Sequence, residues 1–208
     1  GLGTWPLGEK GWGPIDETKA IAVIHKAIDC GINLIDTAPV YGNGRSEEIV
    51  GKAIKACRQR VIIATKCGIH LRGDGFVNDL KPKSIRKELE SSLKRMGIEV
   101  IDLYQCHWPD PNTPIEDTMG EMLKMKSEGK IRYIGVSNFD TSLLQRAQKA
   151  VPVVSNQIQY SLVNREDATQ LIHLVKTADN QSLEMKLRGN AQVEILVKGM
   201  VVSGEGAG

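Results

Sequence analysis

The sequence predicts an α/β protein of the (β/α)-barrel class. Short apolar segments alternate with segments whose apolar residues recur at helical spacing. The apolar segments are continuous, which is typical of parallel strands buried on both faces of a sheet. Their ends follow one another at roughly 20 to 40 residues, the length of one βα repeat. These ends lie at Asp36, Lys66, His107, Ser137 and Gln157.

Helices and strands are assigned from these two kinds of spacing, in chain order. The expected helices lie at 16–30, 46–58, 82–96, 114–128, 140–150 and 166–177. The expected strands lie at 32–35, 61–65, 100–106, 131–136 and 153–156, with a further short candidate at 193–197. Residues 1–6 resemble the tail of a strand that precedes the first helix.

Several helix boundaries carry residues with known positional preferences. Gly31 and Gly97 are placed to close helices. Ser46 is expected as an N-cap followed by acidic residues. Pro82 suits the first position of a helix, and the run 113–116 matches a capping box with proline at the first helical position.

Four ionisable side chains stand at or close after three successive strand ends. They are Asp36, Tyr41, Lys66 and His107. Polar residues at the carboxyl ends of barrel strands form the active sites of this fold. Singly, each has a structural alternative, because a strand-end aspartate often caps a turn and a lone histidine or tyrosine is usually a core residue. Together they indicate a proton-transfer site.

Five motifs within residues 1–165 resemble the aldo-keto reductase family. They are G-I-N-L-I-D-T-A-P-V-Y-G at 31–42, T-K at 65–66, Q-C-H-W at 105–108, G-V-S-N at 135–138 and N-Q-I-Q-Y at 156–160. The most similar branch includes bacterial oxidoreductases and the potassium-channel β subunits. The resemblance implies a (β/α)8 TIM barrel that reduces aldehydes or ketones. It also implies a nicotinamide cofactor bound without a Rossmann domain, usually NADPH, with NADH as the other candidate.

Chemistry and resemblance together suggest a role for each of the four ionisable residues. A tyrosine with an ordinary pKa of about 10 is a poor acid near neutral pH unless its anion is stabilised. A neighbouring ammonium stabilises the anion, and a carboxylate keeps the ammonium charged. Tyr41 is therefore expected to donate the proton, Lys66 to tune Tyr41, and Asp36 to hold Lys66. His107 is expected to orient the substrate oxygen.

The resemblance also implies a cofactor side. Ser137, Asn138 and Gln157 are expected to bind the nicotinamide carboxamide, which offers both a donor and an acceptor. Tyr160 is expected to stack under the nicotinamide ring. The structural alternatives are a turn at residues 137–138 and a core aromatic at Tyr160.

The substrate side is less defined. Trp5 and Trp108 are candidates for the wall of a pocket that takes a small carbonyl substrate, although packing alone would equally explain them. The loops that form such walls vary freely, so the natural substrate stays open. A non-catalytic binding or regulatory subunit, as in the channel-associated branch, is the alternative function.

The C-terminal part departs from the family pattern. Residues 1–208 are expected to form a single barrel domain in which about six βα units are recognisable and 166–208 diverge. The residues after Gln157 are too few for two further units and a cofactor-phosphate loop. Arg188 or Lys198 could face a 2′-phosphate, but solvated charges explain both better. Truncation, an altered reading frame and missing internal segments all remain open.

Composition narrows the partners and the compartment. A net charge of +2 without basic blocks gives no electrostatic case for nucleic acid or membrane surfaces. No apolar run is long enough to span a bilayer, and no signal peptide is visible. The four cysteines form no C-x-x-C pair, which favours free thiols over a disulfide or metal framework. A cytoplasmic protein without a metal site is therefore expected, and its oligomeric state stays open.

Overall fold

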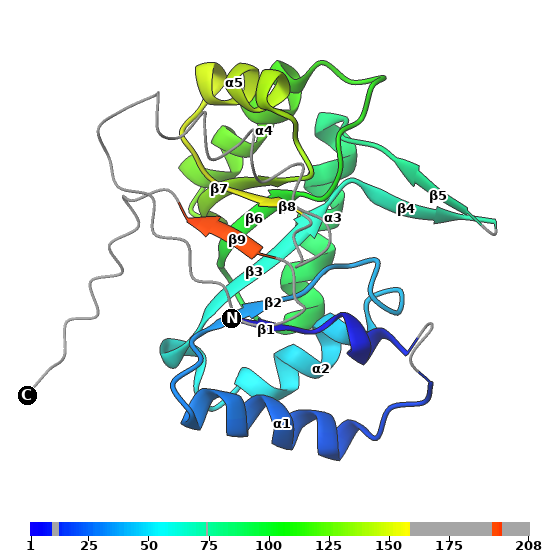
Figure 1. Cartoon of the computed structure of the whole chain (residues 1–208), viewed down its shortest axis with the longest axis vertical. Coiled ribbons are helices and arrows are strands. Elements are labelled where there is room, and N and C mark those ends of the chain that lie inside the picture. Colours follow the sequence, from blue (N-terminus) through cyan, green and yellow to red (C-terminus); the bar gives the residue numbers. More distant parts are fainter. Residues whose placement is uncertain (10–12, 74, 159–192, 197–208) are drawn as a thin grey trace, which may run out of the picture.

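The computed structural model describes residues 1–9, 13–73, 75–158 and 193–196. Within them, seven strands form one sheet in the order β1-β2-β3-β6-β7-β8-β9 (Figure 1). Their bounds are β1 Leu2–Gly3, β2 Leu34–Asp36, β3 Ile62–Cys67, β6 Ile101–Cys106, β7 Ile131–Ser137, β8 Val153–Ile158 and β9 Val193–Leu196. All neighbouring pairs from β1 to β8 are parallel, and β9 is antiparallel to β8.

Helices connect the parallel strands and cover the sheet (Figure 1). They are α1 Glu17–Asp29, α2 Arg45–Ile54, α3 Pro82–Met96, α4 Ile115–Ser127 and α5 Thr141–Ala150. Gln157 Nε2 of β8 lies 3.3 Å from Asp36 Oδ2 of β2, although three strands separate β8 from β2 in the sheet. A flat sheet would hold these strands far apart, since neighbouring strands lie about 4.8 Å apart. The sheet is therefore curled, and the predicted barrel class is confirmed in incomplete form.

The core lies between the strands and the helices. Every residue of β6 is buried, which confirms the expectation of strands covered on both faces. The expected stripe of α3 is buried as well, from Ile85 to Met96, and Gly97 closes the helix with a left-handed backbone. Burial of these side chains holds α3 and β6 in place within the core.

One supersecondary element was not expected from the sequence. Strands β4 (Ile69–Arg72) and β5 (Gly75–Asn78) form an antiparallel hairpin that projects from the body after β3 (Figure 1). Several of its side chains are exposed, so burial imposes no strong apolar pattern on this short segment. The Asn78 side chain ties its base to the loop after β6 by donating to Pro109 O over 2.9 Å.

Two predicted helix caps are wrong. Gly44 occupies the N-cap of α2, while the Ser46 hydroxyl is buried 2.7 Å from Thr4 Oγ1 and so serves tertiary packing. Pro114 occupies the N-cap of α4, and the Thr113 hydroxyl donates to Asp110 Oδ2 over 2.7 Å instead of closing a capping box. In both places the hydroxyl bonds a tertiary or loop partner instead of a backbone N–H at the start of the helix.

Some element boundaries also differ from those predicted. Strand β2 covers 34–36 rather than 32–35. Helix α2 ends at Ile54 rather than at residue 58, and a short 3-10 turn follows at Arg58–Arg60. Strand β3 continues to Cys67, so Lys66 lies within the strand. Boundary shifts of this size leave the order of the elements unchanged.

Most of the divergent C-terminal part lies outside the described residues, including the helix expected at 166–177. The short strand expected near residue 193 is present as β9, and it runs antiparallel to β8. Among the described residues, no helix has the length and apolar character needed to cross a membrane.

Candidate active site

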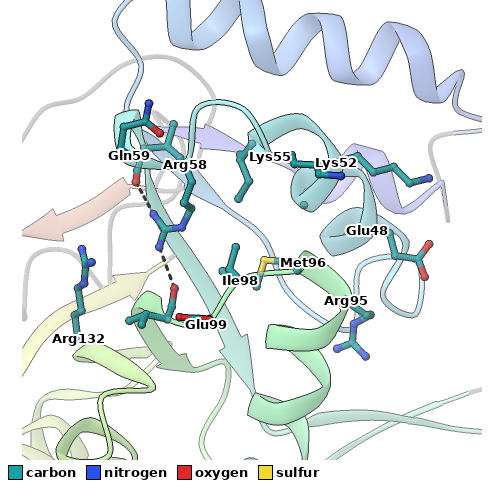
Figure 2. Close-up of a pocket in the computed structure, with 15 residues that line it drawn as sticks. Glu48, Lys52, Lys55, Arg58, Gln59, Arg95, Met96, Ile98, Glu99 and Arg132 are labelled. Atoms are coloured by element: carbon teal, nitrogen blue, oxygen red, sulfur yellow. Dashed lines mark hydrogen bonds between the residues drawn. The ribbon is translucent and has the colours of Figure 1, made fainter.

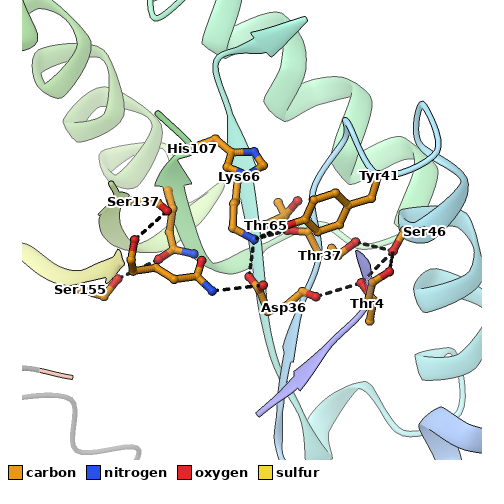
Figure 3. Close-up of polar contacts among 12 residues, drawn as sticks. Thr4, Asp36, Thr37, Tyr41, Ser46, Thr65, Lys66, His107, Ser137 and Ser155 are labelled. Atoms are coloured by element: carbon orange, nitrogen blue, oxygen red, sulfur yellow. Dashed lines mark hydrogen bonds and ion pairs between the residues drawn. The ribbon is translucent and has the colours of Figure 1, made fainter. Parts of the chain in front are cut away.

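Three neighbouring strands bring the predicted catalytic residues together. Asp36 ends β2, Lys66 lies near the end of β3, and His107 directly follows β6. Because β2, β3 and β6 are parallel and adjacent, these residues meet at one edge of the sheet (Figure 3). Tyr41 reaches the same place from the loop between β2 and α2.

Lys66 is the centre of the cluster. Its Nζ donates to Asp36 Oδ1 over 2.7 Å, to Thr37 O over 3.1 Å and to Tyr41 OH over 3.2 Å. The side chain is 1% exposed, so each ammonium proton needs such an acceptor. Burial opposes the charged form, but the Asp36 carboxylate and Tyr41 outweigh it and raise the pKa of Lys66. The amine is therefore held as an ammonium.

A tight backbone contact fixes the turn that carries Tyr41. Gly42 has a φ of +62°, and a Cβ placed there would lie 2.5 Å from Gly8 O. A Cβ on Gly8 would in turn lie 2.5 Å from Gly42 N. Only glycine permits this approach and this backbone conformation together. The centroid of the Trp5 ring lies 6.3 Å from that of the Tyr41 ring.

The Tyr41 phenol keeps its proton in this environment. Burial raises the pKa of Tyr41, and the Lys66 ammonium lowers it by a smaller amount, so the net direction is upward. Lys66 thus acts in the expected sense but does not produce a depressed pKa. The arrangement combines a protonated phenol with a cation that would stabilise its anion.

His107 completes the cluster as a neutral imidazole. Its ring meets that of Tyr41 edge-on, with centroids 5.8 Å apart and planes at 83°. Burial lowers the pKa of His107 to about 3, and the nearby Lys66 ammonium adds to this effect. A neutral imidazole offers one donor and one acceptor, which suits binding of a polar oxygen rather than proton supply.

The residues expected on the cofactor side lie at the ends of β7 and β8. The Ser137 hydroxyl donates to Gln157 O over 2.8 Å, and Asn138 Nδ2 donates to His107 O over 3.0 Å. Asn138 has a φ of 59°, a conformation that asparagine tolerates better than most residues. No hydrogen bond among the described residues uses Asn138 Oδ1. Tyr160 lies outside the described residues.

The two candidate pocket tryptophans are related to the cluster in different ways. Trp5 is 57% exposed beside Tyr41, and Trp108 is 48% exposed and directly follows His107. Both side chains are exposed, and the Trp5 ring contacts that of Tyr41. Their role in substrate binding stays a prediction.

Two groups in or behind the cluster were not identified from the sequence. One is the backbone carbonyl of Thr37, which no side-chain pattern could reveal. The other is Glu47, whose carboxylate is buried and accepts from Thr65 Oγ1 over 2.7 Å. Its position in the first turn of α2 predicted only a favourable helix-end acid. The hydrogen bond between Glu47 and Thr65 forms only because the fold brings α2 against β3.

A groove of about 1060 Å³ lies at the other end of the strands (Figure 2). Its wall includes Val61 and Val100, which precede β3 and β6. Arg58 and Arg132 also line it, but both pair with Asp102, over 2.6 and 2.8 Å. Because the groove lies at the opposite end of the strands from Asp36, Lys66 and His107, it is not the candidate site. The described residues contain no group of three or more His, Cys, Asp or Glu side chains arranged to hold a metal ion.

Fold and site together define a (β/α)-barrel protein with an Asp–Tyr–Lys–His cluster at the carboxyl ends of its strands. Residues 1–183 match the aldo/keto reductase family. The chain belongs to that family, as the motifs indicated.

Two relatives show how much of the family's length is present. The chain is 47% identical over 168 residues to "Aldo-keto reductase YhdN" of Bacillus subtilis, covering 80% of this chain and 51% of that protein. It is 40% identical over 192 residues to the "NADH-specific methylglyoxal reductase" of Escherichia coli, covering 85% of this chain and 59% of that protein. The chain thus spans between half and two thirds of the length of these relatives.

Solved structures give the same picture. The glycerol dehydrogenase AKR11B4 from Gluconobacter oxydans superposes with a TM-score of 0.78 at 42% identity, covering 84% of this chain and 55% of that one. An aldo/keto reductase from Klebsiella pneumoniae, solved in complex with NADP and acetate, has a TM-score of 0.72 at 32% identity, covering 85% and 59%. These structures are (β/α)8 barrels. The curled parallel sheet of this chain corresponds to a part of that fold.

Proposed function

We propose that this protein reduces aldehydes or ketones to alcohols with a nicotinamide dinucleotide as hydride donor. The observation that carries the proposal is the Lys66 ammonium, which hydrogen-bonds both Asp36 and the Tyr41 phenol in a buried site. A phenol that gives up its proton next to a fixed ammonium leaves a stabilised anion.

Each residue of the cluster has one task in this reaction. Tyr41 donates its proton to the substrate oxygen, and Lys66 stabilises the tyrosinate that remains. Asp36 keeps Lys66 charged and aimed at Tyr41, which its bond of 2.7 Å supports. His107 is neutral, so it hydrogen-bonds the substrate oxygen and fixes its distance from Tyr41.

The polar residues at the ends of β7 and β8 fit a nicotinamide carboxamide. Asn138 Oδ1 is an acceptor that no described residue uses, and a carboxamide N–H suits it. Ser137 and Gln157 lie beside it and would complete the set. When bound, the reduced nicotinamide would supply the hydride. NADPH is the first candidate because related structures carry NADP or NADPH, and NADH is the second because one relative is named NADH-specific.

Small carbonyl compounds are the proposed substrates. Methylglyoxal and glyceraldehyde are suitable first probes, since one relative is named a methylglyoxal reductase and another a glycerol dehydrogenase. The exposed rings of Trp5 and Trp108 are proposed to contact the substituent on the carbonyl carbon.

The test follows the loss of reduced nicotinamide absorbance with the full chain, either cofactor and either aldehyde. Wild type should turn over, and Tyr41→Phe should lower kcat at least about a hundredfold because it removes the proton donor. Tyr133→Phe is the matched control, since Tyr133 lies near the start of β7, at the other end of the sheet. Equal turnover in Tyr41→Phe and wild type would refute the proton role. Absence of turnover in wild type would favour a non-catalytic binding or regulatory subunit.

A further inference from the structure

Glu47 is a fully buried carboxylate that the proposed reaction does not use directly. It lies in the first turn of α2, directly after the turn that carries Tyr41. A carboxylate without solvent is costly unless both of its oxygens are bonded and its charge is balanced. Both conditions are met here, by Thr65 and Arg95.

The first partner is on the strand that carries Lys66. Thr65 donates from Oγ1 to Glu47 Oε1 over 2.7 Å, and both residues are fully buried. Successive side chains of a strand point to opposite faces, so Thr65 faces the helices while Lys66 faces the barrel interior. Fixing Thr65 to Glu47 therefore fixes the backbone position from which Lys66 projects.

The second partner is on α3. Arg95 donates from Nε to Glu47 Oε2 over 2.7 Å, which balances the buried charge. The arginine stem also packs on Gly44, where an added Cβ would lie 2.7 Å from Arg95 Cδ. Gly44 has a φ of +97° and ends the Tyr41 turn at the N-cap of α2. Arg95 thus contacts the turn that carries Tyr41, while its ion partner Glu47 is hydrogen-bonded to the strand that carries Lys66.

We propose that Glu47 is a positioning residue that sets the distance between the Tyr41 phenol and the Lys66 ammonium. It joins the element that carries Tyr41 to the element that carries Lys66, from the side of the sheet opposite to the reaction. The inference rests on the proposed function, because the distance matters only if Tyr41 gives up its proton beside Lys66.

The distance in question is sensitive to small movements. Lys66 Nζ and Tyr41 OH are 3.2 Å apart, at the long end of a hydrogen bond, so a further shift weakens the bond steeply. Misplacement of a reacting group by about 1 Å can cost two orders of magnitude in rate. A loss of positioning should therefore appear in kcat, while substrate and cofactor binding persist.

The main test compares two buried threonines. Thr65→Val removes the hydroxyl bonded to Glu47 and keeps the side-chain shape. Thr118→Val is the matched control, since Thr118 is equally buried and its hydroxyl donates to Leu80 O over 2.9 Å. Both variants should lose similar thermal stability. Only Thr65→Val should lower kcat, by about tenfold, with KM for aldehyde and cofactor within about twofold of wild type. An equal effect of the two substitutions on kcat would overturn the proposal.

A conservative variant and a direct measurement separate the possible failures. Thr65→Ser restores the hydroxyl and should recover most of the lost kcat. If Thr65→Val does not fold, Thr65→Ala and Thr118→Ala serve as the pair. A crystal structure of the valine or alanine variant should show Lys66 Nζ farther from Tyr41 OH than in wild type, independently of activity. An unchanged distance would refute the positioning role, whereas an inactive wild type would refute the proposed function.

Discussion

Gln157 donates a hydrogen bond to Asp36, with 3.3 Å between Nε2 and Oδ2, across the inside of the curled sheet. The other oxygen of the same carboxylate accepts from Lys66 over 2.7 Å. Asp36 therefore joins the proposed proton-transfer group to a residue proposed for the cofactor side. Its carboxylate is bonded on both oxygens, which fixes its rotation and thereby the direction in which Lys66 points.

Removing the lysine from this pair should be costly for stability. We expect Lys66→Met to lower the free energy of unfolding by about 3 kcal/mol, because Asp36 would remain buried without its cation. The double variant Lys66→Met/Asp36→Asn should recover at least half of this loss. Urea unfolding monitored by circular dichroism gives both values.

An exposed ion pair provides the control for that experiment. Lys19 lies 3.7 Å from Asp16 at the start of α1, with 84% of its side chain exposed. Lys19→Met should change the free energy of unfolding by less than about 0.5 kcal/mol, because exposed pairs contribute little. Similar losses at the two lysines would contradict the account of the buried pair.

Acidification should destabilise the protein through His107. Its pKa is about 3 in the folded state against an ordinary 6.5, so between these values the unfolded chain binds a proton that the folded chain does not. Stability is therefore retained above pH 6.5 and falls as the pH drops below it. Between pH 7 and pH 5, wild type should lose about 2 kcal/mol more than His107→Gln. Parallel stability curves for the two proteins would show that His107 ionises freely.

A rise in pH from 5 to 8 should destabilise the protein through Glu88. Burial raises the pKa of Glu88 to about 8, partly offset by the bond that its Oε1 accepts from Gly68 N. Between the ordinary 4.5 and 8, the folded state keeps a proton that the unfolded state releases, so stability falls as the pH rises. From pH 5 to pH 8, wild type should lose about 3 kcal/mol relative to Glu88→Gln.

Charged neighbours influence the pKa of Glu88, and one further neighbour, His70, provides a control. Asp79 and Glu47 favour the protonated form, and His70 Nε2 lies 3.3 Å from Glu88 Oε1. His70→Gln should leave the loss of stability between pH 5 and pH 8 in place, because burial is the main cause of the raised pKa of Glu88. A loss that disappears in His70→Gln would instead assign the effect to the Glu–His contact.

The sequence predicted that the candidate residues at strand ends would lie together. Asp36, Lys66 and His107 follow apolar runs, and parallel strands bring such residues to one edge of a sheet. Glu47 could not be found in this way, because its partner Thr65 lies on another element. The hydroxyl of Ser46 was misassigned for the same reason, since a buried tertiary partner replaced the local helix end.

The fold shows the same division. Repeated, fully buried strands such as β6 are predictable because burial dictates their composition. The β4–β5 hairpin is small and exposed, so no burial pattern marks it. The antiparallel direction of β9 was likewise not predictable, because a single short apolar run contains no information about its partner.

The cofactor side of the site is tested most directly at Asn138. Its backbone has a φ of 59° and its Nδ2 bonds His107 O, so replacement by alanine would combine strain with loss of the amide. Asn138→Gly removes the amide and tolerates the conformation. We expect Asn138→Gly to weaken NADPH binding about tenfold, measured by quenching of tryptophan fluorescence, because the acceptor Oδ1 is lost. Asn112→Gly, in the exposed loop after β6, should leave binding unchanged. If both variants bind NADPH as wild type does, Asn138 is a turn residue and the carboxamide is held elsewhere.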